Sequence, residues 1–272
     1  AGKGVIIAKS YEEAFDAVRD IMDNRVFGDA GSRVIIEEFL TGHEVSVLAF
    51  TDGKTVIPMV SSQDHKKVFD NDEGLNTGGM GAFSPSRVYT SEIAEFCMKK
   101  IIIPTVEAMD KEGRTFKGVL YYGLMLTENG PKVLEYNARF GDPETQVVLP
   151  RLKTDIIDIF NAIIDERLDQ ITIEWDERAA ACVIIASGGY PEQYKTGYEI
   201  KGIEKQTDSI MVFHAGTKLK NEKYYTSGGR VLGENLDIAV KKAYHEVGKI
   251  HFQDIHYRKD IGQKKESGSF EG

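Results

Sequence analysis

The chain has 272 residues, of which 41% are hydrophobic and 28% charged, as in an ordinary globular protein large enough for more than one domain. The formal net charge of -9 argues against general nucleic-acid binding, and no apolar run is long enough to cross a bilayer. The cysteines, Cys97 and Cys182, lie far apart inside apolar patterns, so we expect buried thiols in a reducing, cytoplasmic compartment.

The first forty residues predict a strand, a helix and a second strand. Residues 5–8, VIIA, form a short apolar run that favours a buried strand. Ser10 with Glu13 three residues later is a capping box, and the apolar spacing that follows predicts a helix. Residues 33–40, RVIIEEFL, predict the second strand. The chain has no initiator Met and opens in a glycine loop, so we expect an N-terminal portion to be lacking.

Two strand pairs and two helices are predicted in the next part of the chain. One pair follows His43 and turns at Asp52-Gly53, and the other covers residues 119–138 and turns at Asn129-Gly130. The two helices are predicted at residues 90–113, with a break or kink near Pro104, and at residues 153–171. The polar, glycine-rich stretch 61–86 is too irregular for an element, and a loop this long is usually functional or mobile.

The composition changes near Ile173, where we place a domain boundary. Short strands, glycine-rich turns and one long helix at residues 235–250 are predicted beyond it. The last residues, from 262 on, have the composition of a disordered tail.

The stretch KVLEYNARFGDPETQ, residues 132–146, places three polar side chains on one strand face. Side chains alternate across a strand, so Glu135, Asn137 and Arg139 point the same way. A carboxylate and an amide oxygen make a partial shell for Mg²⁺, which completes its octahedron with waters and phosphate oxygens. Arg139 can hold a phosphate or carboxylate. The plainer alternative, a solvated face with a local ion pair, is favoured by the spacing alone.

Three further segments carry functional patterns, each with a plain alternative. The glycines of GLNTGGMGA let backbone amides approach a ligand, unless the segment is only a flexible loop. The segment QDHKK, with Asp64, His65 and Lys66, is either an anion and amine site or a charged turn. In IIEEFLTGHEVSV a strand ends as a linker that can face a base edge, with Glu44 near a ribose, or it is an exposed edge strand. The opening AGKG is weak evidence for a phosphate-covering loop.

The segments EEFLTGHEVS, QDHKK, GLNTGGMGAFSP and EYNARFGDPETQ, in this order and spacing, resemble the phosphoribosylamine–glycine ligases, which are ATP-grasp enzymes of purine biosynthesis. The resemblance covers nearly the whole chain. It implies an α+β ATP-grasp fold, with antiparallel-rich sheets and helices that clamp ATP, followed by a small C-terminal α/β closing domain. It also implies ATP and Mg²⁺ or Mn²⁺ as cofactors, glycine and 5-phosphoribosylamine as substrates, and a monomer or weak homo-oligomer without nucleic-acid or membrane partners.

The resemblance also implies roles for single residues. Magnesium would be held by Glu135 and Asn137. The predicted catalytic residues are Lys66, Arg139 and Asp142. The predicted nucleotide-binding residues are Lys3, Glu37, Glu38, Phe39, Leu40 and Glu44. The predicted substrate-binding residues are Asp64, Asn76, Thr77, Gly78, Gly79, Arg139, Asp142 and Glu144.

The expected domains are the rest of the lid subdomain at residues 1–40, the ATP-grasp core with the metal and substrate site at 41–172, the C-terminal domain at 173–261 and the tail at 262–272. The family has an N-terminal domain that helps to form the substrate site, and this chain lacks it, so the chain alone is expected to bind nucleotide poorly. Two alternatives remain: another ATP-grasp carboxylate–amine ligase, and a non-catalytic ATP-binding module.

Overall fold

A computed structural model describes residues 5–203, 210–236, 244–245 and 247–263. The chain divides into two compact units, Ala1–Gly42 and His43–Gly272. Each unit is described by itself.

The first unit has the predicted helix but not the predicted strands. Helix α1 (Tyr11–Met22) begins at Ser10, whose hydroxyl accepts a hydrogen bond from the Glu13 amide at 3.2 Å. A short 3-10 helix, η1 (Gly28–Ser32), follows. The strands predicted at residues 5–8 and 33–40 are wrong for the described part of the chain. A strand needs a hydrogen-bonded neighbour, and neither segment pairs with another one, so Ile35 and Ile36 stay 84% and 86% exposed.

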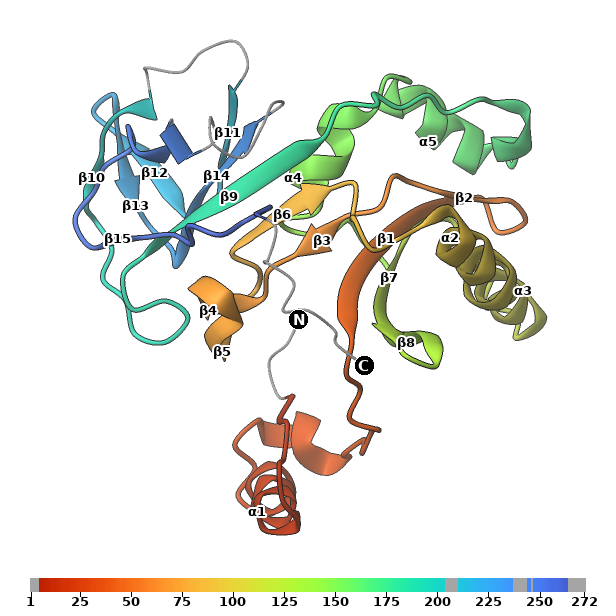
Figure 1. Cartoon of the computed structure of the whole chain (residues 1–272), viewed down its shortest axis with the longest axis horizontal. Coiled ribbons are helices and arrows are strands. Elements are labelled where there is room, and N and C mark those ends of the chain that lie inside the picture. The colour runs from red at the N-terminus through yellow and green to blue at the C-terminus, as the bar shows by residue number, and fades with distance from the viewer. Residues whose placement is uncertain (1–4, 204–209, 237–243, 246, 264–272) are drawn as a thin grey trace, which may run out of the picture. The chain divides into compact units, whose positions relative to one another are not determined.

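The second unit contains a four-stranded antiparallel sheet in the order β2-β1-β7-β8 (Figure 1). Its strands are β1 (His43–Thr51), β2 (Val56–Pro58), β7 (Gly118–Thr127) and β8 (Gly130–Asn137). Both predicted turns are confirmed. The Asp52 carboxylate accepts from the amides of Lys54 and Thr55, which closes the first turn, and Gly130 has a positive φ of 98° in the second.

Helices cover one face of this sheet. Helix α2 (Ser91–Cys97) runs through a π-helical turn, η3 (Met98–Ile102), into α3 (Ile103–Lys111). The irregular turn directly before Pro104 confirms the predicted break, since proline cannot donate the next helical hydrogen bond. Side chains of the helices and the sheet form one apolar core, which includes Val47, Ile102, Val106, Tyr122 and Leu124.

A second, six-stranded sheet lies beside the first and includes strands from both sides of the predicted boundary at Ile173. Its main path is β11-β14-β9-β6-β3, and β15 pairs with β9. The strands are β3 (Gln63–Asp64), β6 (Gly81–Ser84), β9 (Ala180–Ser187), β11 (Ile210–His214), β14 (Arg230–Leu236) and β15 (Ile255–His256). Because β6 pairs directly with β9, the hydrogen bonding of the sheet is continuous across the predicted boundary. The boundary itself stays a prediction.

The remaining elements complete the second unit. Helices α4 (Thr145–Val148) and α5 (Ile156–Ile164) share a core with Leu48, Phe50 and Ile184, and α5 confirms the predicted helix. Short 3-10 helices follow each of them, η4 (Leu149–Arg151) and η5 (Leu168–Gln170). A three-stranded sheet is formed by β10 (Glu199–Ile200), β13 (Lys223–Thr226) and β12 (Thr217–Lys220).

The stretch 61–86 is more regular than predicted. Besides β3 and β6 it contains the hairpin of β4 (Lys67–Phe69) and β5 (Glu73–Asn76), joined by η2 (Asp70–Asp72). The prediction of an irregular loop is wrong, because strands of two to four residues with an irregular register are too short to show an alternating pattern. Loop and strand here are distinguished only by pairing partners distant in sequence.

Three other predictions concern the C-terminal helix and tail, the cysteines and membrane spans. Most of the helix predicted at 235–250, and the tail from 264 on, lie outside the described residues. Cys97 and Cys182 are buried thiols, as predicted. Among the described residues, no helix has the length and apolar character needed to cross a membrane.

Candidate functional site

The predicted metal ligands lie on the face of the four-stranded sheet opposite α2 and α3. The strand register aligns Ser46 with Gly123 and Glu135, and it aligns Tyr121 with Asn137. Directly paired residues point to the same side of a sheet. The structure therefore confirms that Glu135 and Asn137 share a face, and it adds the hydroxyls of Ser46 and Tyr121 to that face.

Lys66 is the cation at the centre of a group of carboxylates. Its Nζ lies 2.8 Å from Glu44 Oε2. Burial by itself would lower the pKa of Lys66, but the charges of Asp64, Glu44 and Glu135 outweigh it and raise the pKa above the usual value. Lys66 therefore stays protonated, and Glu44, which the sequence placed at a ribose, forms an ion pair here.

Asp64 lies beside Lys66 at the end of β3. Burial, together with the charges of Glu144 and Glu44, raises the pKa of Asp64 to about 8, against the opposing effect of Lys66. A carboxyl group with this pKa is mostly protonated at neutral pH. Asp64 can therefore donate a hydrogen bond, or exchange a proton, at a pH where an ordinary aspartate cannot.

Glu144 is buried and belongs to a hydrogen-bonded group of three side chains. Its Oε1 accepts from the Tyr121 hydroxyl at 2.8 Å and from the Ser46 hydroxyl at 3.1 Å. Burial and the nearby carboxylate of Glu144 raise the pKa of Tyr121 well above its usual value. The sequence analysis missed Ser46 and Tyr121. Ser46 had one available signal, since it is the only polar residue in the apolar run of residues 45–50.

The oxygens of Glu135 and Asn137 fit a hard cation in part. Asn137 Oδ1 accepts from Arg139 Nη2 at 3.4 Å, so Arg139 lies next to the predicted metal ligands. The described residues contain no group of three or more His, Cys, Asp or Glu side chains that could hold a metal ion. The two oxygens agree with the chemistry of Mg²⁺, which commonly takes one or two protein ligands and fills its other positions with water and phosphate oxygens.

Asp142 is held by an arginine from the C-terminal part of the chain. Arg230, in β14, forms an ion pair with Asp142 Oδ2 at 2.9 Å and donates to the Asp142 carbonyl at 3.0 Å. The same guanidinium donates to the Gly78 carbonyl at 3.0 Å. The sequence analysis did not identify Arg230, because no local pattern links a residue in the turn TSGGRVL to a turn 88 positions earlier.

The glycine loop has a packing requirement in addition to the predicted role. Gly79 has a φ of 117°, and a Cβ there would lie 2.4 Å from Pro143 Cδ. The amides of the loop already donate within the protein: Thr77 to the Lys66 carbonyl, Gly78 to the Tyr190 hydroxyl, and Gly79 to the Thr77 hydroxyl. Asn76 is exposed at the end of β5. The loop lies next to Asp142 and Lys66, as the predicted substrate site requires.

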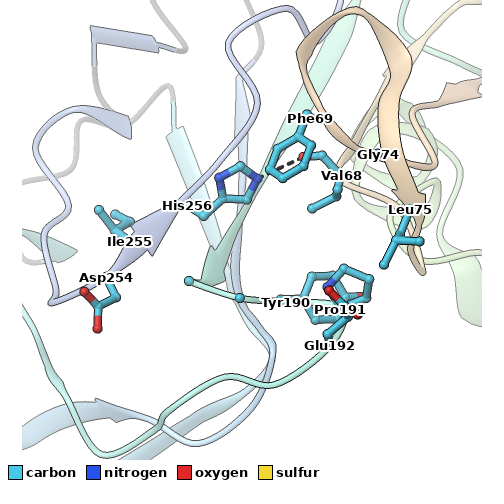
Figure 2. A pocket seen from close by; sticks show the side chains of 12 residues that line it. Val68, Phe69, Gly74, Leu75, Tyr190, Pro191, Glu192, Asp254, Ile255 and His256 are labelled. Atoms are coloured by element: carbon cyan, nitrogen blue, oxygen red, sulfur yellow. Dashed lines mark hydrogen bonds between the residues drawn. The ribbon is translucent and has the colours of Figure 1, made fainter.

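A pocket of about 420 Å³ is lined in part by the β4–β5 hairpin (Figure 2). Phe69 and His256 line it with their rings edge to face, and the His256 Nε2–H donates to the Val68 carbonyl at 2.9 Å. The charged side chains that line it are the carboxylates of Glu192 and Asp254. None of the predicted site residues lines this pocket, and among the described residues no lysine or arginine lines it that could bind a phosphate. We therefore locate the candidate site at Lys66 and not in this pocket.

The predicted nucleotide-binding residues other than Glu44 belong to the first unit. Lys3 lies outside the described residues. The side chains of Glu37, Glu38 and Phe39 are exposed, and Leu40 is partly buried. Their roles stay predictions.

The raised pKa of Asp64 predicts a pH-dependent stability difference. The folded-state pKa is above the usual 3.8, so the favourable contribution of the protonated group is complete below pH 4 and is lost as the pH rises towards 8. In Asp64→Asn the amide does not titrate, so this variant does not lose stability for this reason as the pH rises. We expect the melting temperature of this variant, relative to the native protein, to rise by several degrees between pH 5 and 8 and then level off. Asp165→Asn, at an exposed aspartate, is the control; parallel melting curves for Asp64→Asn would contradict the assignment.

Two family models match the chain. One is described as "Phosphoribosylglycinamide synthetase, ATP-grasp (A) domain" and matches residues 1–145. The other is described as "Phosphoribosylglycinamide synthetase, C domain" and matches residues 180–264.

Similar proteins agree with these matches. A phosphoribosylamine–glycine ligase of Halalkalibacterium halodurans is 49% identical over 269 residues, which are 97% of this chain and 62% of the relative. One of Escherichia coli O6:H1 is 51% identical over 271 residues, or 96% of this chain and 63% of the relative. The crystal structure of a Thermotoga maritima phosphoribosylamine–glycine ligase superposes with a TM-score of 0.79 at 32% identity, over 95% of this chain and 66% of that one. The predicted α+β ATP-grasp fold is confirmed, and the chain spans somewhat less than two thirds of the length of these curated relatives.

Proposed function

Because the chain belongs to the phosphoribosylglycinamide synthetase family, we propose that it is the catalytic core of a ligase that joins glycine to 5-phosphoribosylamine with the hydrolysis of ATP to ADP and phosphate. The observation that carries this proposal is the group of carboxylates around Lys66, on the same sheet face as Glu135 and Asn137. A site with this excess of negative charge favours cations, and both a metal ion and an amine substrate supply them. The proposed compartment is the cytoplasm.

The reaction has two steps with different demands. A glycine carboxylate oxygen attacks the γ-phosphorus of ATP, which gives glycyl phosphate and releases ADP. The nitrogen of phosphoribosylamine then attacks the carbonyl carbon, phosphate leaves, and the nitrogen loses a proton. The protein positions the reactants, offsets charge and excludes water, which would otherwise hydrolyse the acyl phosphate.

We assign these tasks to particular residues of this chain. Lys66 and Arg139 hold the carboxylate and the transferring phosphoryl group, since both remain cationic throughout. Asp64, with its raised pKa, can hydrogen-bond the amine substrate as a donor or receive its proton at slightly alkaline pH. Burial is the main cause of the raised pKa of Asp64, and the carboxylate of Glu144, fixed by Ser46 and Tyr121, adds to it.

The oxygens of Glu135 and Asn137 would hold magnesium or manganese. When bound, the ion would offset charge on the β- and γ-phosphates of ATP. Arg139, which donates to the Asn137 amide oxygen, orients that ligand and connects the metal position with the carboxylate position.

The test is ADP release by the product of the complete reading frame that contains this chain. We expect sustained ADP release only when ATP, glycine and freshly generated phosphoribosylamine are all present, because glycine must accept the phosphoryl group and the amine must then consume glycyl phosphate before the next turnover. Leaving out glycine or phosphoribosylamine in turn gives the controls.

Two outcomes would contradict the proposal in different ways. ATP binding without ADP release would favour a non-catalytic ATP-binding module. ADP release that needs a different amine, found in a screen of acceptors, would favour another ATP-grasp carboxylate–amine ligase.

A further inference from the structure

Gly78 of the glycine loop is held on both sides by side chains from the C-terminal part of the chain. The Gly78 N–H donates to the Tyr190 hydroxyl at 3.1 Å, and the Gly78 carbonyl accepts from Arg230 Nη1 at 3.0 Å. Tyr190 follows β9 and Arg230 begins β14, so neighbouring strands of one sheet present the two groups. Each of the two peptide groups that flank Gly78 is therefore bonded to a side chain more than 100 positions away in sequence.

The Arg230 guanidinium also reaches the other predicted substrate motif. It bonds the carbonyl and the carboxylate of Asp142, at 3.0 and 2.9 Å, while it holds Gly78. The Arg230 side chain is 23% exposed and that of Asp142 is 51% exposed, so this ion pair is partly shielded from solvent on the arginine side. A single cation thus fixes the spacing between the loop NTGG and the turn GDPE.

The surrounding contacts leave little freedom for this arrangement. A Cβ at Gly78 would lie 3.0 Å from the Arg230 guanidinium carbon, and a Cβ at Gly229 would lie 2.4 Å from the Tyr190 ring. These distances are too short for a side chain without movement of its neighbour. The glycines of the segments NTGG and SGGR therefore allow Tyr190 and Arg230 to approach the loop.

We propose that Tyr190 and Arg230 are positioning residues that set the glycine loop and Asp142 in the arrangement needed to bind the amine substrate. This inference rests on the proposed function. It assigns to the C-terminal part of the chain a role in the substrate site itself, because two of its side chains fix the geometry of Gly78 and Asp142. They act through those residues and do not contact the reacting atoms.

Hydrogen exchange tests the contact without any need for activity. Tyr190→Phe keeps the ring and removes only the hydroxyl that accepts from Gly78. Loss of one neutral hydrogen bond predicts about fivefold faster exchange in the peptide that contains Gly78. Tyr194→Phe is the matched control. The ring of Tyr194 lies 6.2 Å from that of Tyr190, but the Gly78 N–H donates to the Tyr190 hydroxyl and not to that of Tyr194. Equal exchange in Tyr190→Phe and the native protein would overturn the proposed contact.

Steady-state kinetics of the full-length protein test the positioning role. We expect Arg230→Ala to raise the KM for phosphoribosylamine about tenfold or more, as expected for a lost charge-assisted contact, with the KM for ATP unchanged. Millimolar guanidinium should restore part of the loss in Arg230→Ala and have no such effect in Tyr190→Phe. A variant that is only less stable would show equal changes for all substrates and no rescue, and that result would overturn the proposal.

The two measurements also separate this inference from the proposed function. Faster exchange at Gly78 together with unchanged kinetics would show that the contact does not position the substrate. If the native protein had no glycine-dependent ADP release, the proposed function would fail, and with it the substrate role. The exchange measurement would still decide whether Tyr190 and Arg230 hold the loop.

Discussion

Glu135→Ala is expected to lower magnesium-dependent turnover by about 10²-fold or more while the protein keeps its fold. Glu135 is exposed and lies near the end of β8, so truncation removes a charged oxygen ligand without opening a cavity in a core. Asn137 is then the only predicted ligand left on this strand face, and a neutral amide oxygen holds Mg²⁺ more weakly than a carboxylate. Initial rates over a range of Mg²⁺ concentrations measure the effect on the full-length protein.

A second readout separates metal binding from other causes of lost activity. Mn²⁺ binding in the presence of ATP, followed by electron paramagnetic resonance, should weaken in Glu135→Ala, and the circular dichroism spectrum should not change. Glu128→Ala is the matched control, because Glu128 is an exposed glutamate in the turn of the same hairpin. Near-native turnover or Mn²⁺ binding in Glu135→Ala would show that the assignment of the metal ligand is wrong.

The local parts of the fold were predictable because their causes lie within a few residues. The capping box at Ser10, the turns at Asp52-Gly53 and Asn129-Gly130, and the break before Pro104 all depend on the conformational preferences of single residues. Alternation along β8 was enough to place Glu135 and Asn137 on one face.

The long-range parts were not predictable in this way. Residues 33–40 have the composition of a strand, but a strand also needs a partner, and none pairs with them in the described part of the chain. Conversely, the irregular stretch 61–86 forms strands because β9, about 100 positions later, offers an edge to β6. The strand propensity of a segment is only a local preference, and pairing with a strand distant in sequence determines whether the segment forms a strand.

The same distinction applies to the candidate site. Lys66, Asp64 and Glu44 were singled out from motifs, but their mutual charge effects depend on a sheet register that no single segment contains. Arg230 and Tyr190 were not found, since each lies in a glycine-rich turn that is ordinary in composition. Their contacts with Gly78 exist only in the folded chain.

Arg258 is the residue whose loss we expect to destabilise the second unit most. It is fully buried, and its guanidinium bonds the carboxylates of Asp72 and Asp260 and the carbonyl of Lys67. Burial by itself lowers the pKa of Arg258, but its bonds to Asp260 and Asp72 outweigh this and raise the pKa, so the charge is retained. These contacts hold the β4–β5 hairpin, which leads into the glycine loop, against the segment that follows β15.

Arg258→Ala leaves the partly exposed carboxylates of Asp72 and Asp260 without their cation and removes the largest fully buried side chain of the described residues. Because water can reach these carboxylates in part, we expect a loss of roughly 3 kcal/mol, at the low end for a broken buried pair, and the urea midpoint should fall with little change in the slope. Arg178→Ala is the matched control: Arg178 pairs with Asp176 at 2.7 Å, but its side chain is 59% exposed, and loss of an exposed pair changes stability by about 1 kcal/mol or less. If both variants unfolded at the same urea concentration, the Arg258 network would contribute no more than a surface pair, and the hairpin would have to be held mainly by its own strand pairing.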